Sequence, residues 1–377
     1  MRKLFVVLTI LALSACSNKY LDAGYSKEEY NKIKDLSEKN QIFFESYDEK
    51  LALLLDNENF EVNNFETYYM FINFLDSDAL VENVNDGSIG SFNYALIKRL
   101  SKVDDFDSNN LKKYLDKAKY VNDASTVVKL VNDNLRVNIK LVNEFLKDEC
   151  YLVRNLANYI KYYSNEKTIR ENIEYVNTYN YLTYFEDGEY ADPEKYGYQV
   201  NVNKFFYLGE DYNPDDLVDL TSEQGYGSLR KEAYDAFVKM QKAAKEDGIS
   251  FYATSSYRSY STQVKIYNSY LAIDPQEKVD IYSARPGFSD HQTGLTVDIL
   301  KSGYDFGNFY KSDASKWLLE NAYKYGFICR YPEGKDNVTG YEYEPWHYRY
   351  VGDVAEDVYN SGLSYDEYFE VYIRESE

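Results

Sequence analysis

The chain has 377 residues, carries a formal net charge of −21, and is 44% hydrophobic, with 43 tyrosines and 20 phenylalanines. This length predicts two domains, and the apolar content is ample for packed cores, which excludes disorder over most of the chain. The acidic balance excludes a nucleic-acid partner, because binding phosphates requires clustered Lys and Arg, and it argues against adsorption of the protein surface to anionic lipid.

The first residues have the pattern of a targeting segment. Met1-Arg2-Lys3 is followed by an apolar run from Leu4 to Leu13, which is too short to span a bilayer. The run ends in "LSAC", which resembles the lipobox of bacterial lipoproteins, where the cysteine becomes the lipid-modified N-terminus. We therefore predict a signal peptide over residues 1–16, lipidation at Cys16, and an extracytoplasmic protein anchored by lipid to the bacterial cell membrane. An ordinary secretory signal is the alternative.

Two further cysteines, Cys150 and Cys329, lie far apart in the sequence, and neither belongs to a CxxC motif. This spacing excludes a metal site built from paired thiolates. Free cysteines are among the most buried residues of proteins, so we expect both to be buried as small apolar side chains. A disulfide between them is the alternative that the sequence leaves open.

Residues 17–190 are predicted to form an all-α region with a weak internal repeat. From about Tyr25 to Asn180, apolar and aromatic residues recur at intervals of three and four, and prolines are absent. A Val-Asn pair recurs roughly every 45 residues, which suits stacked helical pairs, although coincidence in a Tyr- and Asn-rich region is the alternative. The pairs lie in "VENVND" (81–86), "VKLVND" (128–133) and "IEYVNT" (173–178), and the tyrosines that precede them are Tyr68, Tyr114 and Tyr159.

Residues 191–377 are predicted to form an α+β domain, because strands and helices mix there without regular alternation. Gly, Asp, Pro and Tyr crowd residues 186–227, where the composition changes. Ser228 is expected to cap a helix that ends at Gly248 and buries Ala233, Phe237, Met240 and Ala244. The other expected elements are a strand at 249–256, a helix at 261–271, a strand at 295–300, a helix at 313–325, strands at 327–330 and 341–351, and a last helix opened by a capping box of Ser364 and Glu367.

The only two histidines of the chain, His291 and His347, both lie in this domain and close to carboxylates. Strand alternation in "LTVDIL" (295–300) turns Asp298 to the face opposite the apolar side chains, and the loop with Gly294 can bring His291 beside it. His347 could add a third ligand from a neighbouring strand, with Glu344 close by. Three N or O ligands, an open position and a nearby carboxylate are what a hydrolytic zinc site needs.

Blocks around these residues resemble the VanY-type D-alanyl-D-alanine carboxypeptidases, zinc peptidases whose class also includes L,D-carboxypeptidases. The resemblance covers about residues 200–360 and implies a small antiparallel sheet flanked by helices, of the hedgehog and DD-peptidase type, with Zn²⁺ as cofactor. The blocks stand in the family's order: "VNKFFYLGEDYNPDDLV" (202–218), "SSYRSYSTQ" (255–263), "SARPGFSDHQTGLTVDI" (283–299), "WLLENAYKYGFICRYP" (317–332) and "GYEYEPWHYRYVG" (340–352).

Carried over by position, the resemblance implies a role for each residue of the site. The zinc ligands would be His291, Asp298 and His347, and Glu344 would be the catalytic base. Arg258 would bind the free carboxylate of the substrate, and the further substrate contacts would be Gln263, Ser283 and Ser289. The sequence departs from the family's pattern at Asp290, where glutamate is usual, and at Thr296, where alanine is common. Neither is a ligand, so we expect activity to survive.

The function that follows is removal of the C-terminal D-alanine from peptidoglycan stem peptides by a D,D-carboxypeptidase. One alternative is L,D-cleavage of tetrapeptide stems, which depends on a pocket shape that the sequence does not reveal. The other is a non-catalytic lipoprotein that binds peptidoglycan, and the presence of Glu344 counts against it because a binder needs no base. The helical region would then be a spacer or a wall-binding arm.

Overall fold

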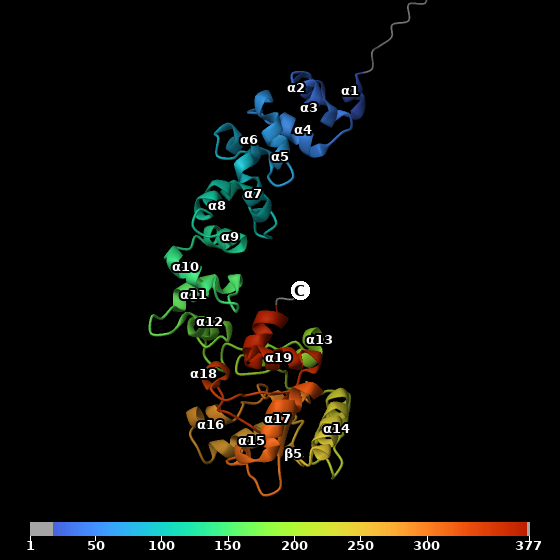
Figure 1. The fold of residues 1–377 in the computed structure, drawn as a ribbon, viewed down its shortest axis with the longest axis vertical. Coiled ribbons are helices and arrows are strands. Elements are labelled where there is room, and N and C mark those ends of the chain that lie inside the picture. Colours follow the sequence, from blue (N-terminus) through green and yellow to red (C-terminus); the bar gives the residue numbers. More distant parts are fainter. Residues whose placement is uncertain (1–17, 375–377) are drawn as a thin grey trace, which may run out of the picture. The chain divides into compact units, whose positions relative to one another are not determined.

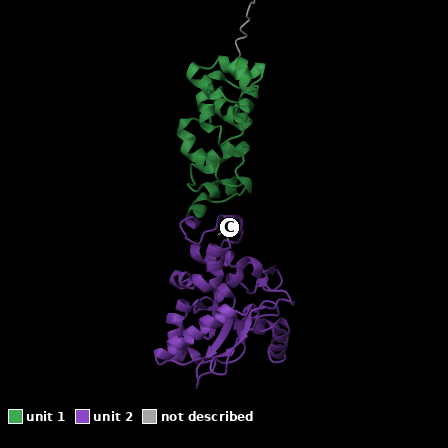
Figure 2. Cartoon of the chain, turned by 90° about the vertical axis from the view of Figure 1, so that its right-hand side faces the viewer, with its two compact units in different colours: residues 1–143 green, residues 144–377 purple. Residues whose placement is uncertain are grey.

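The computed structural model describes residues 18–374, so the predicted signal peptide and Cys16 lie outside the described residues. The chain divides into two compact units, residues 1–143 and residues 144–377 (Figure 2). The change from helices to a mixed fold comes later, at β1 (Glu189–Tyr190), close to the predicted change near residue 190. The last helices of the repeat therefore belong to the second unit by their contacts.

The described part of the first unit is helical, as predicted (Figure 1). Its core is rich in aromatic side chains such as Phe44, Phe65 and Tyr68. No helix within residues 18–374 has both the length and the apolarity to cross a membrane. The helices up to the end of the repeat are α1 (Lys19–Ala23), α2 (Lys27–Lys34), α3 (Glu38–Gln41), α4 (Glu49–Asp56), α5 (Phe65–Phe71), α6 (Ser77–Asn85), α7 (Tyr94–Leu100), α8 (Leu111–Lys117), α9 (Ala124–Asn132), α10 (Ile139–Phe145), α11 (Leu156–Tyr162) and α12 (Ile169–Asn177).

The sequence repeat corresponds to a hydrogen-bonded unit that the structure builds three times. In the middle copy, the buried hydroxyl of Tyr114 donates to Oδ1 of Asn132 at 2.6 Å and accepts from the backbone N–H of Asp107 at 3.3 Å. The amide of Asn132 donates in turn to the carbonyl of Asp105 at 2.7 Å. Tyr68 with Asn85 and Tyr159 with Asn177 make the same set of contacts. The repeated Tyr and Asn are thus a clamp between the two helices of each pair.

The last copy of the repeat packs against the C-terminal segment of the chain, within the second unit. Arg154, just before α11, bonds the carboxylate of Glu370 at 3.1 Å, and the hydroxyl of Tyr179 donates to the same carboxylate at 3.0 Å. Glu370 is 1% exposed. Buried charges need such partners, so this cluster explains why the compact units divide before the end of the repeat.

The second unit contains a four-stranded antiparallel sheet with strand order β5-β6-β8-β7. Figure 1 labels its edge strand, β5. The structure thus has the predicted α+β architecture. The sheet strands are β5 (Tyr252–Ser255), β6 (Thr296–Leu300), β7 (Phe327–Cys329) and β8 (His347–Tyr350). Two smaller pairs are parallel β1 with β2 (Phe206–Tyr207) and antiparallel β3 (Leu217–Asp219) with β4 (Ser228–Arg230). The helices are α13 (Pro193–Tyr196), α14 (Lys231–Glu246), α15 (Tyr260–Leu271), α16 (Gln276–Tyr282), α17 (Asp313–Asn321), α18 (Asp336–Thr339), α19 (Ala355–Ser361) and α20 (Tyr365–Tyr368).

Helix α14 covers the apolar face of this sheet with the four residues that its periodicity predicts, Ala233, Phe237, Met240 and Ala244, all fully buried. The predicted cap was wrong. Ser228 lies in β4, where its hydroxyl donates to Asp219 across the hairpin at 2.6 Å, so α14 begins only after Arg230. The strand predicted at 341–351 is shorter, because only His347–Tyr350 pair with neighbouring strands. The capping box of Ser364 and Glu367 is confirmed at α20.

Both cysteines outside the signal segment are free thiols, which excludes the disulfide alternative. Cys150 is 3% exposed and its carbonyl accepts the amide of Asn177 in the last repeat clamp. Cys329 lies in β7, and burial raises the pKa of its thiol to about 12. The predicted burial is therefore confirmed for Cys150, whereas the Cys329 residue is only partly buried.

The repeat clamp predicts a specific loss of stability. Tyr114→Phe leaves Oδ1 of Asn132 and the N–H of Asp107 without their partner, so the free energy of unfolding should fall by about 1–3 kcal/mol. Urea denaturation of the chain from Ser17 onward measures this. Tyr120→Phe, at a side chain that is 63% exposed, is the matched control and should change stability by less than about 0.5 kcal/mol. Equal midpoints for the two variants would show that the clamp carries no stability.

Candidate metal centre

Two adjacent strands place two of the predicted ligands directly opposite each other. In the register of β6 against β8, Asp298 pairs with His347, and Thr296 pairs with Arg349. Directly opposed residues of an antiparallel pair point to the same side of the sheet. The carboxylate and the imidazole therefore meet on the face opposite the apolar core.

A tight turn brings the third ligand to the same point. His291 lies in a 3₁₀ turn, Asp290–Thr293, which ends at Gly294 with φ of +69°. A Cβ at Gly294 would lie 3.0 Å from the side chains of Arg230 and Leu217, so both the backbone conformation and the space favour glycine. The chain reverses there into β6, as the sequence predicts, and His291 comes to lie beside Asp298.

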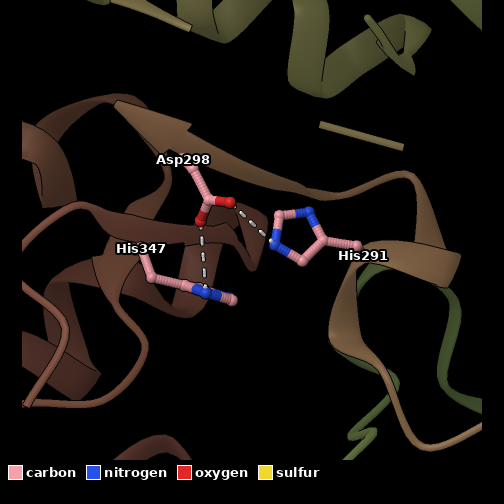
Figure 3. A group of neighbouring side chains, drawn as sticks. All are labelled: His291, Asp298 and His347. Atoms are coloured by element: carbon pink, nitrogen blue, oxygen red, sulfur yellow. Dashed lines mark ion pairs between the residues drawn. The ribbon is translucent and has the colours of Figure 1, made fainter. Parts of the chain in front are cut away.

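The three side chains converge in Figure 3, with the carboxylate of Asp298 between the two imidazoles. One donor atom from each residue lies within 4.8 Å of the others. Nε2 of His291 is 3.3 Å from Oδ2 of Asp298, and Nδ1 of His347 is 3.4 Å from Oδ1. All three residues are buried, so the site is a closed cluster rather than a chance gathering of surface acids.

The hydrogen bonds of the rings fix which nitrogen faces the centre. Nδ1 of His291 lies 2.7 Å from the carbonyl of Ser256, so it carries the proton and leaves the Nε2 lone pair toward Asp298. Burial and the charge of Arg258 lower the pKa of His291, which favours the neutral, metal-binding form. Burial opposes ionisation of Asp298, but the His291 imidazole and the charges of Arg258 and His347 outweigh it and hold the pKa of Asp298 well below the usual range.

The cluster fits a divalent metal. Oδ1 of Asp298 is buried and has no hydrogen-bond partner among the described residues, which is costly unless a cation satisfies it. Two imidazole nitrogens and one carboxylate oxygen are a donor set that zinc accepts, with a fourth position left for water. His291, Asp298 and His347 are therefore the residues that would hold the ion.

Glu344 stands beside the cluster without belonging to it. Its Oε2 lies 2.9 Å from Nδ1 of His347, and burial raises the pKa of its carboxyl. Burial opposes protonation of His347, but Asp290 and Glu344 outweigh it and raise the pKa of the imidazole to about 9. A metal at Nδ1 must therefore displace a proton, and Glu344 is the carboxylate next to it.

All four predicted substrate contacts line one cavity of about 270 Å³ together with the metal cluster: Arg258, Gln263, Ser283 and Ser289. Arg258 bonds Asp298 through Nη2 at 2.8 Å and Ser255 through Nε at 2.9 Å. Gln263 donates to the carbonyl of Ala284 at 2.8 Å, so its amide also holds the loop that carries Ser283. The sequence missed most of the aromatic wall of the cavity, since its members lie on two helices and several loops that are far apart along the chain: Tyr270, Tyr282, Phe306, Tyr331, Tyr341 and Trp346.

A small antiparallel sheet with a buried His-Asp-His cluster, a carboxylate beside it and an arginine in the same cavity defines a metallopeptidase type of site. Residues 227–353 match the family model VanY, D-alanyl-D-alanine carboxypeptidase. The second unit of the chain therefore belongs to the VanY family of peptidases, as the sequence blocks indicate.

Known relatives agree with this assignment. A putative carboxypeptidase, YodJ, of Bacillus subtilis is 42% identical over 45% of this chain and 66% of its own length. A D-alanyl-D-alanine carboxypeptidase of Enterococcus faecalis is 39% identical over 33% of this chain and 50% of its own length. The solved structure of the LdcB LD-carboxypeptidase is 38% identical, with 50% of this chain and 92% of that chain covered and a TM-score of 0.46. The chain thus spans between half and two thirds of the two curated relatives.

The metal assignment predicts a measurable loss of affinity. Asp298→Asn keeps the shape of the side chain but removes the charge between the two imidazoles, so affinity for zinc should fall further than the roughly 10- to 100-fold that loss of an outer hydrogen-bond partner costs. Competition with a chromophoric chelator measures this. Asp313→Asn, at a carboxylate that is 55% exposed, is the control and should bind zinc like the wild type. Equal affinities for all three proteins would contradict the site.

A buried lysine behind the cavity predicts a pH dependence. Nζ of Lys204 donates to the carbonyls of Asp280 and Gly340 and lies 4.3 Å from the ring centre of Tyr341, and burial lowers its pKa to about 8. The unfolded chain therefore binds more protons than the folded one between pH 8 and 10.5, so stability should rise with pH across that window. Relative to Lys204→Met, the wild type should gain at most about 3 kcal/mol, measured by urea denaturation at each pH. A wild type that loses stability relative to Lys204→Met as the pH rises through this window would contradict the burial argument.

Proposed function

We propose that this protein is a zinc-dependent carboxypeptidase that removes the C-terminal D-alanine from peptidoglycan stem peptides as a D,D-carboxypeptidase. The observation that carries the proposal is a buried cluster of His291, Asp298 and His347, which shares one cavity with Glu344 and Arg258. The name of the Enterococcus faecalis relative supports the choice of substrate.

The side chains of the cavity have different roles in the proposed reaction. Bound zinc supplies a Lewis acid and lowers the pKa of a water molecule toward about 7. Glu344 takes the proton of the attacking water and returns it to the leaving amine, and its raised pKa suits a group that must hold a proton in the middle of the reaction. The buried walls exclude bulk water and strengthen each charge interaction inside.

Arg258 is the residue that selects the C-terminal end of the substrate peptide. It uses Nε for Ser255 and Nη2 for Asp298, which leaves Nη1 for the terminal carboxylate of a peptide. Only the C-terminal end of a substrate peptide offers a carboxylate next to the scissile bond. An arginine that contacts the metal ligand Asp298 directly, at 2.8 Å, therefore favours an exopeptidase.

We also propose that the enzyme acts outside the cytoplasm while anchored by lipid at Cys16. The support is the sequence pattern of residues 1–16, a basic start, a short apolar run and the "LSAC" ending. A diacylglycerol and an N-acyl chain together anchor firmly, whereas a single acyl chain binds only marginally. This location places the catalytic unit next to its substrate.

Defined muropeptides test the activity and its specificity. The chain from Ser17 onward is incubated with zinc and with pentapeptide or tetrapeptide stems, and the products are followed by mass. Loss of one alanine from the pentapeptide alone is the expected D,D result. Loss from the tetrapeptide alone would replace the D,D proposal with L,D-cleavage. If zinc is shown to be bound and neither stem loses alanine, the proposal of an enzyme is wrong and the non-catalytic peptidoglycan-binding alternative remains.

The assigned base predicts a separation of chemistry from metal binding. Glu344→Ala should lower kcat by about 10²- to 10⁴-fold, because it removes the carboxylate beside the metal cluster, while zinc still binds with nearly the affinity of the wild type. Glu333→Ala, at an exposed carboxylate in the preceding loop, is the control and should keep full activity. A Glu344→Ala protein that loses zinc together with activity would make Glu344 a ligand instead of the base.

A further inference from the structure

The outer nitrogen of His347, like Oδ1 of Asp298, is a buried atom of the metal centre without a hydrogen-bond partner among the described residues. Nδ1 faces Asp298 and Glu344, whereas this outer nitrogen, Nε2, points to the other side of the ring. Oδ2 of Asp290 lies 3.6 Å from this Nε2. A histidine that binds a metal almost always directs its other nitrogen at a carboxylate or carbonyl, which fixes the tautomer and the ring orientation.

Asp290 is itself held firmly from three sides. It is 2% exposed, and Nη1 of Arg349 forms an ion pair with its Oδ1. The hydroxyl of Thr296 donates to Oδ2 at 2.7 Å, and Nε of Arg330 lies 3.8 Å from the same oxygen. Arg330 and Arg349 are fully buried, so these cations keep the carboxylate ionised and in place.

The far edge of Arg330 is fixed in turn by the C-terminal segment. Its two terminal nitrogens bond the carboxylate of Asp366 in α20 at 2.8 and 2.9 Å, and Asn203 donates to the same carboxylate at 2.6 Å. The arginine therefore cannot turn away from Asp290 without breaking a buried pair. The support of the metal centre thus extends to the last helix of the chain.

We propose that Asp290 and Thr296 act as one positioning unit for His347, a role that rests on the proposed zinc-dependent function. The aspartate directs its charge at Nε2, and the threonine hydroxyl sets the position of the aspartate oxygen that does so. Thr296 is fully buried and lies opposite Arg349 in the β6–β8 register, so the hydroxyl and the guanidinium reach the carboxylate from neighbouring places in the sheet.

The two side chains are in direct contact, so a change in the size of one affects the position of the other. Asp290→Glu adds a methylene, and Thr296→Ala removes a hydroxyl and a methyl group, so the second change makes the space that the first fills. The contact between the two side chains indicates that they form a compensating pair. The same carboxylate position can then be reached by a short acid with a hydroxyl beside it or by a longer acid with a methyl group.

Zinc affinity tests the unit independently of turnover. Thr296→Val keeps the shape and removes the hydroxyl, and Asp290→Asn removes the charge. Each should weaken zinc binding, by about 10- to 100-fold for Asp290→Asn, and alter the absorption spectrum of the cobalt-substituted protein. Asp290→Glu and Thr296→Ala should each weaken binding alone, whereas the double variant should recover to within a few-fold of the wild type. Thr178→Val, at a buried threonine in the repeat whose hydroxyl bonds the carbonyl of Glu174, is the control and should leave zinc affinity unchanged.

The outcomes separate the two proposals. Wild-type affinity and an unchanged cobalt spectrum in Asp290→Asn and Thr296→Val would overturn the positioning role. A double variant that binds zinc no more tightly than the weaker-binding single variant would also overturn the positioning role. Asp290→Asn could fail to fold, because two buried arginines lose their partner. In that case Thr296→Val and the double variant of Asp290→Glu with Thr296→Ala still test the positioning role. A wild-type protein that binds zinc yet cleaves neither stem overturns the proposed function alone.

Discussion

The pairing of β6 with β8 is the constraint on which the metal centre depends. It sets Asp298 opposite His347 and Thr296 opposite Arg349, so a ligand pair and its support lie on one side of two strands. Val297 and Tyr348, opposed between them, point into the apolar core and are fully buried. A slip by one residue would exchange these faces, moving charged groups into the core and valine into the site. The hydrophobic core thus determines the register, and the register determines the ligand geometry.

Behind this face the protein buries an unusual amount of charge for a small sheet. Arg330 and Arg349 are fully buried, and their partners Asp290 and Asp366 are almost so. Such pairs add little net stability compared with well-packed apolar residues, but removal of one partner leaves a buried charge at a cost of several kcal/mol. The benefit is that each charged side chain is held in one position, because a buried charge has few other places where it finds a partner. A catalytic centre that needs donors placed within a fraction of an ångström gains from that rigidity.

The helical region uses a different device, a neutral Tyr–Asn clamp repeated between helix pairs. Its last copy is joined to the catalytic unit through Arg154, Tyr179 and Glu370, so this part of the repeat is structurally part of that unit. Its role as a spacer or wall-binding arm stays a prediction. The clamp explains why one tyrosine and one asparagine recur in each copy of the repeat, since each copy requires both side chains and a backbone carbonyl in fixed places.

The sequence by itself determined which residue types the candidate metal site contains. Two histidines in a whole chain, each beside carboxylates, left few choices for the metal ligands, and local periodicity was enough for the buried face of α14 and the cap of α20. Only the tertiary structure decided that Ser228 belongs to a hairpin, that His291 presents Nε2, and that Asp290 lies beside both His347 and Thr296. These facts depend on strand register and on contacts between distant residues, which no local pattern encodes.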